Sequence, residues 1–264
     1  MASSSSPFDE LAADYDTSFT QSACARTLRA RVWKRALTLF AGRERILELG
    51  CGTGEDAVHL ARAGHRVCAT DASPGMIQVA RHKAVAAGVA DRIDFRVMHA
   101  EELDALPRDA RFDAVFSNFG ALNCVADLPA MARSLGPLLA AGAPVLLVVM
   151  GRHVPWEWAW FLARGDRRRA FRRLNRDGAT WRGLTIHYPT PAELARALAP
   201  DFVTRRRAAL GFALPPSYAA GWLDRSPRSL AALDAFDHLL DGFTAGLSDH
   251  YLLEATRAPP ERAA

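Results

Sequence analysis

Lysine and cysteine are both scarce in this chain of 264 residues, and each scarcity excludes a class of site. The only lysines are Lys34 and Lys83, and neither follows a tyrosine at the Tyr-x-x-x-Lys spacing that one common dehydrogenase family uses. The four cysteines are scattered and form no Cys-x-x-Cys pair, which is not the pattern of a zinc site or a disulfide framework. We therefore expect no metal, and a reducing, cytoplasmic environment.

Long apolar runs are also missing. No run is long enough to form a membrane-spanning helix, and residues 1–6 form a short polar serine run without the apolar segment of a secretory signal. Half of the residues are hydrophobic, which is enough for a sizeable core. We expect no membrane partner and a single domain, with or without a cap.

The net charge of +4 and the pI near 9.1 raise the question of a nucleic-acid partner. The positive charge is almost entirely arginine in an alanine-rich chain, a usage typical of GC-rich genomes, so we expect no nucleic acid. Eight arginines lie between Arg164 and Arg182. We interpret them as a solvated helix face with Phe171 and Leu174 on its buried side; a clamp for an acidic or phosphorylated acceptor is the alternative.

The most informative stretch begins at Arg45 and leads into a glycine loop. Residues 45–49 predict an apolar strand, and it breaks into Gly50-Cys51-Gly52-Thr53-Gly54 before a helical pattern over 55–62. A second predicted strand, 66–70, ends at Asp71. Glycines allow a ligand to approach the backbone closely, a helix N-terminus offers free N–H groups, and a carboxylate after the next strand can accept both ribose hydroxyls. The pattern indicates a nucleoside-cofactor site.

Two other cofactors fit this loop less well. A dinucleotide fingerprint requires Gly-x-Gly-x-x-Gly, and here Gly54 is followed by Glu55, whose charge would lie beside a pyrophosphate. A P-loop requires Lys and then Ser or Thr after its last glycine, and this chain has neither there.

The order of predicted elements is that of a doubly wound α/β core. A helical N-terminal segment over 8–40 precedes it, and Ser73-Pro74 opens a helix that continues to about residue 87. Further strands are predicted at 93–98, 112–117 and 145–150, and a helix at 128–139. After Met150 the pattern changes, and we predict a short strand at 183–188, a helix at 191–198, a strand at 202–210, a helix at 229–243 and a last strand at 249–256.

Four motifs carry a resemblance to class I S-adenosylmethionine-dependent methyltransferases. They are 48–54 (Glu-Leu-Gly-Cys-Gly-Thr-Gly), 71–76 (Asp-Ala-Ser-Pro-Gly-Met), 99–103 (His-Ala-Glu-Glu-Leu) and 112–118 (Phe-Asp-Ala-Val-Phe-Ser-Asn). The resemblance implies a Rossmann-like seven-stranded sheet, mostly parallel with its last strand antiparallel. We expect one domain: residues 1–150 form an N-terminal cover and the cofactor-binding core. Residues 151–264 add the remaining strands and cap insertions at about 151–189 and 215–247.

The same resemblance implies the residues that bind S-adenosylmethionine and its product S-adenosylhomocysteine. Gly50, Cys51, Gly52 and Gly54 would lie against the methionine part, Glu48 would fix the loop and help to hold the amino group, and Asp71 with Ala72 would lie at the ribose. Met76, Ala100 and Glu101 would lie at the adenine, although Met76 is also a plausible helix core residue, and the family often has Asp where His99 stands. Asn118 and Phe119 would face the methyl group. Tyr15, from an Asp-Tyr-Asp stretch, would fold over the cofactor, and Thr20 and Arg31 are further candidates for its carboxylate.

Methyl transfer is an in-line displacement, so the protein must mainly orient the acceptor and exclude water, and a dedicated base is optional. His153 and His187, next to the aromatic residues after Met150, are the candidate bases. Trp156, Trp160 and Tyr188 are the candidate walls of the acceptor pocket. The alternation of Trp156, Trp158 and Trp160 fits a strand face equally well, and their packing onto the core is the alternative to a pocket.

We therefore predict a methyltransferase for a small-molecule acceptor enclosed under a cap. DNA amino-methylating, RNA cytosine and magnesium-dependent catechol types are disfavoured, since the residues after the fourth strand lack their motifs. Three alternatives stay open: an RNA-modifying methyltransferase, a cofactor-binding cyclase or accessory protein that transfers no methyl group, and a nicotinamide oxidoreductase. The acceptor, the methylated atom, the pathway and the oligomeric state are not encoded in any motif.

Overall fold

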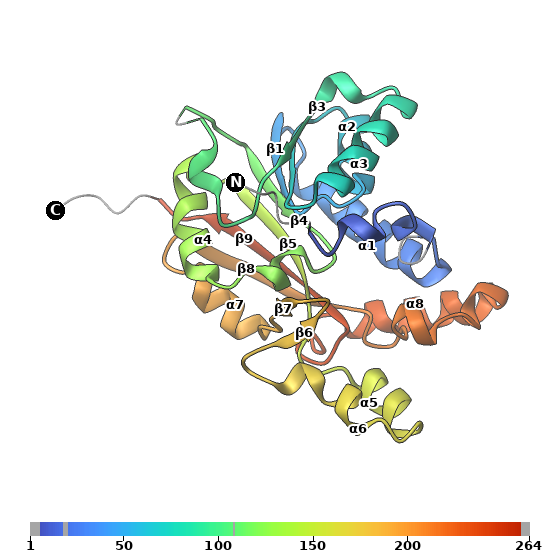
Figure 1. Ribbon diagram of the computed structural model, residues 1–264. Helices are drawn as coiled ribbons and strands as arrows, with labels where there is room; N and C mark the ends of the chain where they lie inside the picture. Colours follow the sequence, from blue (N-terminus) through green and yellow to red (C-terminus); the bar gives the residue numbers. More distant parts are fainter. Residues whose placement is uncertain (1–5, 18–20, 108, 260–264) are drawn as a thin grey trace.

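The computed structural model describes residues 6–17, 21–107 and 109–259, and a seven-stranded sheet forms its centre (Figure 1). The strand order is β3-β2-β1-β4-β5-β9-β8. The strands are β1 (Arg45–Leu49), β2 (Arg66–Asp71), β3 (Ile93–Val97), β4 (Ala114–Ser117), β5 (Pro144–Met150), β8 (Phe202–Leu210) and β9 (His250–Arg257). The first five pair in parallel, and β9 is antiparallel to both of its neighbours, β5 and β8. The predicted fold class is confirmed.

Helices cover both faces of the sheet. On one face α1 (Ala23–Leu39), α2 (Glu55–Arg62) and α3 (Pro74–Ala86) bury apolar residues in one core cluster. On the other face α4 (Leu128–Leu135) and α7 (Pro191–Leu198) contribute to a second cluster. The residues of β5 are buried almost throughout, as expected of a strand that is covered on both faces. None of the helices in the described part of the chain combines the length and apolarity that crossing a membrane requires.

Two segments extend beyond this layered core. After β5 come α5 (Pro155–Leu162), α6 (Arg167–Ala170) and a small hairpin of β6 (Ala179–Trp181) and β7 (Leu184–Ile186). After β8 comes α8 (Pro227–Leu240), which contacts α1. In Figure 1, α5 and α6 lie at the bottom of the molecule and α8 projects to the right. Both segments leave the sheet at the end where its parallel strands finish, because they follow β5 and β8 directly.

Helix starts agree best with the sequence. The hydroxyl of Ser73 accepts a hydrogen bond from the backbone N–H of Met76, and Pro74 occupies the first turn of α3, as the Ser-Pro pair predicts. The predicted helix over 128–139 is too long: α4 ends at Leu135, and a 3-10 turn, Gly136–Leu138, follows. Pro137 has no N–H with which to continue the α-helical pattern.

Two interpretations of the segment after β5 are wrong. The alternating tryptophans lie on helix α5, not on a strand. The arginine run is not one solvated helix face, because Gly165 and Gly178, both with left-handed φ, interrupt it and α6 spans only Arg167–Ala170. Phe171 and Leu174 are exposed, whereas Ala170 and Arg173 are buried. The run therefore contains one buried arginine that apolar periodicity could not reveal.

Candidate active site

The glycine loop after β1 has a backbone that only glycine adopts easily. Gly50, Gly52 and Gly54 have φ of 71°, 52° and 76°, in the left-handed region that other residues avoid. A Cβ on Gly50 would lie 2.1 Å from Cβ of Ala121, and one on Gly54 would lie 2.7 Å from Cβ of Ala80. A Cβ on Gly52 would meet nothing within 4 Å. Gly50 and Gly54 are thus needed by the fold, while the open space at Gly52 permits close approach of a ligand.

Asp71 joins the end of β2 to this loop. Its Oδ2 accepts a hydrogen bond from Gly52 N at 2.8 Å, and its Oδ1 accepts one from Ser73 N at 2.9 Å. Burial raises the pKa of the Asp71 carboxyl above its ordinary value, and the two N–H groups oppose that rise only in part. Each carboxylate oxygen accepts more than one hydrogen bond, so both retain a lone pair for hydroxyl groups of a ligand.

Glu48, on β1, is a buried acid with unused bonding capacity. Its side chain is 1% exposed, and its Oε2 has no hydrogen-bond partner among the described residues. Burial raises the pKa of Glu48 well above its ordinary value; the nearby Asp56 adds to the rise and Arg29 opposes it. A buried carboxyl group without a partner is costly, and a positively charged ligand group would relieve that cost.

A polar cluster around Asp56, in the first turn of α2, lies beside Glu48. The Asp56 carboxylate accepts hydrogen bonds from Trp33 Nε1 at 2.6 Å and Asn118 Nδ2 at 3.1 Å, and it forms an ion pair with Arg29 at 2.6 Å. The Arg29 guanidinium lies 4.8 Å from the centre of the Phe119 ring. These contacts hold Asn118 and Phe119, the residues that follow β4, close to the start of α2, which comes directly after the glycine loop. Phe119 has a φ of 45°, a strained value for a bulky residue that is characteristic of functional sites.

The N-terminal segment is tied to the same loop. Asp16 accepts hydrogen bonds from Thr53 Oγ1 at 2.6 Å and from Lys83 Nζ at 2.7 Å. Burial raises the pKa of Tyr15, and the charges of Arg29 and Asp71 also act on its hydroxyl group. Tyr15 therefore lies close to the groups on which a cofactor role depends.

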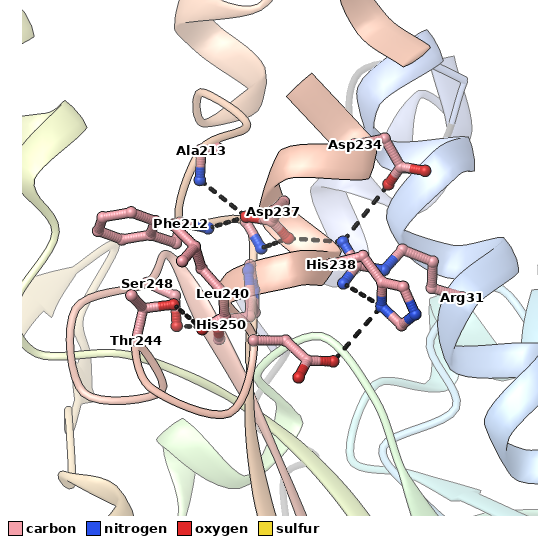
Figure 2. Close-up of polar contacts among 12 residues, drawn as sticks. Arg31, Phe212, Ala213, Asp234, Asp237, His238, Leu240, Thr244, Ser248 and His250 are labelled. Carbon is pink, nitrogen blue, oxygen red and sulfur yellow. Dashed lines mark hydrogen bonds and ion pairs between the residues drawn. The ribbon is translucent and has the colours of Figure 1, made fainter. Parts of the chain in front are cut away.

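Arg31 does not lie on this side of α1. It forms ion pairs with Asp237 at 2.5 Å and Asp234 at 3.4 Å, both on α8 (Figure 2). Arg29 and Arg31 are two residues apart and so point to different sides of the helix. The structure thus gives no support to the candidate role of Arg31 at the cofactor carboxylate, whereas Arg29, paired with Asp56, lies beside the glycine loop. The other candidate, Thr20, lies outside the described residues.

The residues predicted at the adenine end lie after β2 and β3. Met76 is buried on α3, Ala72 and Ala100 are half-buried, and Glu101 is exposed. Oε1 of Glu101 accepts a hydrogen bond from Ala126 N at 3.2 Å. Their contact with adenine stays a prediction.

The predicted acceptor-side residues are spread over the segment after β5. Trp156 Nε1 donates to the carbonyl oxygen of Ala213 at 3.0 Å. Trp160 lies 3.4 Å, ring centre to guanidinium carbon, from Arg164. Tyr188 is buried. The His153 ring packs against Trp158 at 6.3 Å, and the His187 backbone forms hydrogen bonds with Asn123 through both its N–H and its carbonyl oxygen.

A buried charge network, which the sequence did not predict, links this segment to the start of β9. Arg173 Nη2 lies 2.8 Å from Glu157 Oε2 and 2.8 Å from Asp249 Oδ1. The Tyr218 hydroxyl donates to Glu157 Oε2 at 3.1 Å. Beside Asp249, the His250 ring packs edge-on against Phe119 at 5.3 Å. Only the polarity of Glu157 within an aromatic helix could have indicated this network.

Residues 46–142 match a family model described as a methyltransferase domain. The chain is 38% identical over 122 residues to a demethylmenaquinone methyltransferase of Clavibacter sepedonicus, covering 46% of this chain and 47% of the relative. It is 34% identical over 155 residues to a ubiquinone biosynthesis O-methyltransferase of Methylocella silvestris, covering 59% of this chain and 56% of the relative. The chain thus spans about half the length of the curated relatives it matches.

A solved structure extends the likeness to the whole fold. The CcbJ methyltransferase from Streptomyces caelestis superposes with a TM-score of 0.61 and 18% identity, covering 98% of this chain and 100% of that one. The segment that matches the family model, residues 46–142, includes the glycine loop, Asp71 and the residues that follow β4. Residues 46–142 therefore carry a methyltransferase domain, in agreement with the motifs in that segment.

Proposed function

We propose that this protein transfers the methyl group of S-adenosylmethionine to a small-molecule acceptor. The observation that supports it most directly is the pair of acids at the glycine loop. Asp71 is fixed by the backbone N–H groups of Gly52 and Ser73, and Glu48 is buried with an unpartnered oxygen. A nucleoside that carries ribose hydroxyls and an ammonium group supplies what these two acids lack.

The cofactor would be held by residues from four strand ends. Asp71 and Ala72 would bind the ribose; Met76, Ala100 and Glu101 would lie at the adenine. Glu48, with the open face of Gly52, would receive the amino-acid part, and Tyr15 would cover it. Cys51 and the other two glycines of the loop shape its backbone, and Asn118 and Phe119 would face the transferred methyl group.

The bound cofactor supplies a methyl group on a positively charged sulfur. The chain's own residues must place an acceptor atom in line with that bond and keep water away. Residues 151–189 and 215–247 follow β5 and β8 at the edge of the sheet where the glycine loop also lies. We propose that they form the cap, with Trp156, Trp160 and Tyr188 among its acceptor-side residues.

The acceptor that we propose is an aromatic ring compound. The two curated relatives are named demethylmenaquinone methyltransferase and ubiquinone biosynthesis O-methyltransferase, and an aromatic segment such as α5 suits a flat apolar ring. Hydroquinones and catechols are thus the first compounds to test. Isotope-labelled methyl groups from S-adenosylmethionine appearing in such a product would establish the reaction. Cofactor binding without any labelled product would favour the cyclase or accessory alternative, and affinity for RNA that falls steeply with salt would favour the RNA-modifying one.

Asp71→Ala tests the cofactor site. Affinity for S-adenosylhomocysteine, measured by calorimetry, should fall by about 1–3 kcal/mol because charge-assisted hydrogen bonds to the ribose are lost. Asp94→Ala is the matched control: Asp94 is an exposed acid on the neighbouring strand β3 whose partner is Arg96, and its removal should leave the affinity unchanged. Equal affinities for wild type and Asp71→Ala would refute the ribose role.

We further propose a cytoplasmic location and no nucleic-acid partner. The four cysteines are free in the structure, which agrees with a reducing environment. Cell fractionation of the tagged protein tests the location.

A further inference from the structure

His250 lies at the same edge of the sheet as the glycine loop. It is the first residue of β9 and pairs with Met150 and Leu210, the last residues of β5 and β8. Because β9 runs antiparallel to its neighbours, its beginning lies where the parallel strands end. Ligands of open α/β sheets bind at that edge. The Ser248 hydroxyl group, which donates to the His250 carbonyl oxygen (Figure 2), helps to fix this end of the strand.

The His250 ring is in contact with the residue predicted to face the methyl group. It packs edge-on against Phe119 with ring centres 5.3 Å apart, and Phe119 also contacts the Arg29 guanidinium that is paired with Asp56. The His250 side chain is 14% exposed, so it is largely enclosed but still reachable.

A buried carboxylate adjoins the imidazole. Asp249 Oδ2 lies 3.2 Å from His250 Nδ1, within ion-pair distance but without hydrogen-bond geometry, and Nδ1 has no hydrogen-bond partner among the described residues. Although burial alone would raise the pKa of Asp249, the positive charge that His250 carries when protonated and the charge of Arg173 hold it well below its ordinary value, so Asp249 is ionised at neutral pH. An ionised carboxylate at Nδ1 favours a proton on that nitrogen and leaves Nε2 as the basic atom.

Arg173 fixes the orientation of this carboxylate. Its Nη2 contacts Asp249 Oδ1, the oxygen that does not face His250, while its Nη1 donates to the carbonyl oxygens of Gly151 and Asp249 at 3.1 Å and 3.2 Å. Arg173 Nη2 also forms an ion pair with Glu157, whose carboxylate accepts a hydrogen bond from the Tyr218 hydroxyl group. The charged groups that bear on the imidazole are thus Asp249 directly, Arg173 and Glu157 behind it, and Arg29 across Phe119.

The other histidines lack this arrangement. His153 and His187 have no ion pair with any acid in the described ranges. His238 Nδ1 lies 3.4 Å from Asp241 Oδ2, but its side chain is 72% exposed on α8. Within the part of the chain that the structure describes, only His250 combines a buried acid, partial enclosure and contact with Phe119.

From this placement we propose that His250 accepts the proton released on methylation, with Asp249 as its positioning residue. In that step, the lone pair of an acceptor oxygen or nitrogen forms the bond to the methyl carbon, and the carbon–sulfur bond breaks with its electron pair going to sulfur. The proton on the acceptor atom moves to Nε2 of His250. The inference rests on the proposed function and narrows it: the acceptor atom bears a proton, as in a phenol, a catechol or an amine.

The test compares His250→Gln with wild type on a panel of hydroquinones, catechols and primary amines. We expect the rate of methyl transfer at neutral pH to fall by about 100-fold or more, with S-adenosylhomocysteine affinity unchanged by calorimetry. The rate of the variant should rise with pH, because the acceptor then ionises in solution. His238→Gln, which changes the exposed histidine beside Asp241, is the matched control and should behave as wild type.

Asp249→Asn tests the positioning residue. Removing the carboxylate should lower the rate of methyl transfer at neutral pH while leaving S-adenosylhomocysteine affinity, measured by calorimetry, unchanged. Rescue of the rate by Asp249→Glu would support positioning rather than a purely structural role.

Each outcome decides between the two proposals. If His250→Gln transfers methyl groups as fast as wild type, the inference is overturned and the proposed function stands. The inference is likewise overturned if wild type binds S-adenosylhomocysteine but methylates no member of the panel, since it requires such an acceptor. If wild type binds no S-adenosylhomocysteine, the proposed function itself fails.

Discussion

Two buried acids at the same edge of the sheet differ in their partners. Glu48, beside the glycine loop, is buried with an unpartnered oxygen, and its pKa is raised, mainly by burial. Asp249, beside the segment after β5, is also buried, but Arg173 and His250 hold its pKa well below the ordinary value. The chain satisfies the second acid and leaves the first one unsatisfied.

We interpret this difference as one between an acid that binds a ligand and an acid that holds a neighbouring side chain in place. An acid that the chain leaves without a partner costs stability and is retained where a ligand completes it. An acid that is paired internally cannot serve a ligand cation, but it can hold a neighbouring side chain in place. We therefore propose that a cofactor completes the glycine-loop region. In the network of Glu157, Arg173 and Asp249 the charges are paired with one another, although Glu157 Oε1 and Arg173 Nε form no hydrogen bond among the described residues.

The largest expected loss of stability comes from breaking the ion pairs of Glu157, Arg173 and Asp249. Arg173→Met removes the cation that Glu157 and Asp249 share and leaves Glu157 paired only with the half-buried Arg172. We therefore expect the free energy of unfolding to fall by about 3–5 kcal/mol. Urea denaturation at pH 7 measures it. Arg169→Met is the matched control, because Arg169 belongs to the same run but is 68% exposed in its pair with Asp166; it should cost well under about 1 kcal/mol. Equal losses in the two variants would contradict the buried network.

A smaller loss of stability should follow from a substitution in the glycine loop. Gly50→Ala must adopt a left-handed φ and place its Cβ 2.1 Å from Ala121, for which we expect about 2–4 kcal/mol of destabilisation. Gly42→Ala has a similar φ of 75° but open space around its Cβ, so only the left-handed cost of about 1–2 kcal/mol applies. Thermal unfolding of the two variants separates crowding from backbone strain. Equal losses would show that Ala121 moves away at little cost.

The glycine-loop side could be predicted from sequence because its requirements are local. A glycine with left-handed φ, a serine that caps α3 and an acid at the end of β2 each occupy a fixed place relative to a strand end, so the positions of Glu48, Asp71 and Ser73 in the fold followed from spacing. The mostly parallel seven-stranded sheet was implied by the resemblance to class I methyltransferases. Among the strands, β5 is a continuous apolar run, which identifies a buried parallel strand directly.

The ion pairs of Arg173 and Arg31 could not be predicted because the paired residues are far apart along the chain. Arg173 and Asp249 are 76 residues apart, and Arg31 and Asp237 are 206 apart. An arginine run on its own favours a solvated face, and only the tertiary fold shows which arginine is enclosed. The same reason hid His250: a histidine at a strand end carries no signal until Phe119 and Asp249 are seen beside it.

The smallest expected change in stability, and the one that tests the comparison most directly, is Glu48→Gln. For Asp249 the folded-state pKa lies below the unfolded one, so its stabilisation is present above the unfolded value of about 4 and is lost as pH falls below it. For Glu48 the folded-state pKa lies above the unfolded one, so its contribution is present below about 4.3 and is lost as pH rises. The two acids should therefore give opposite slopes of stability against pH.

Glu48→Gln removes only the Glu48 slope. At pH 7 we expect the variant to be more stable than wild type by about 1–3 kcal/mol, because no buried carboxylate has to be ionised or kept neutral; near pH 4 the two proteins should be equally stable. The same variant should bind S-adenosylhomocysteine more weakly by calorimetry, since its ammonium group loses the acid that we propose as its partner. A variant that is both less stable at pH 7 and unchanged in affinity would place Glu48 with Asp249, as an acid that the chain satisfies by itself, and would remove the contrast between the two sites.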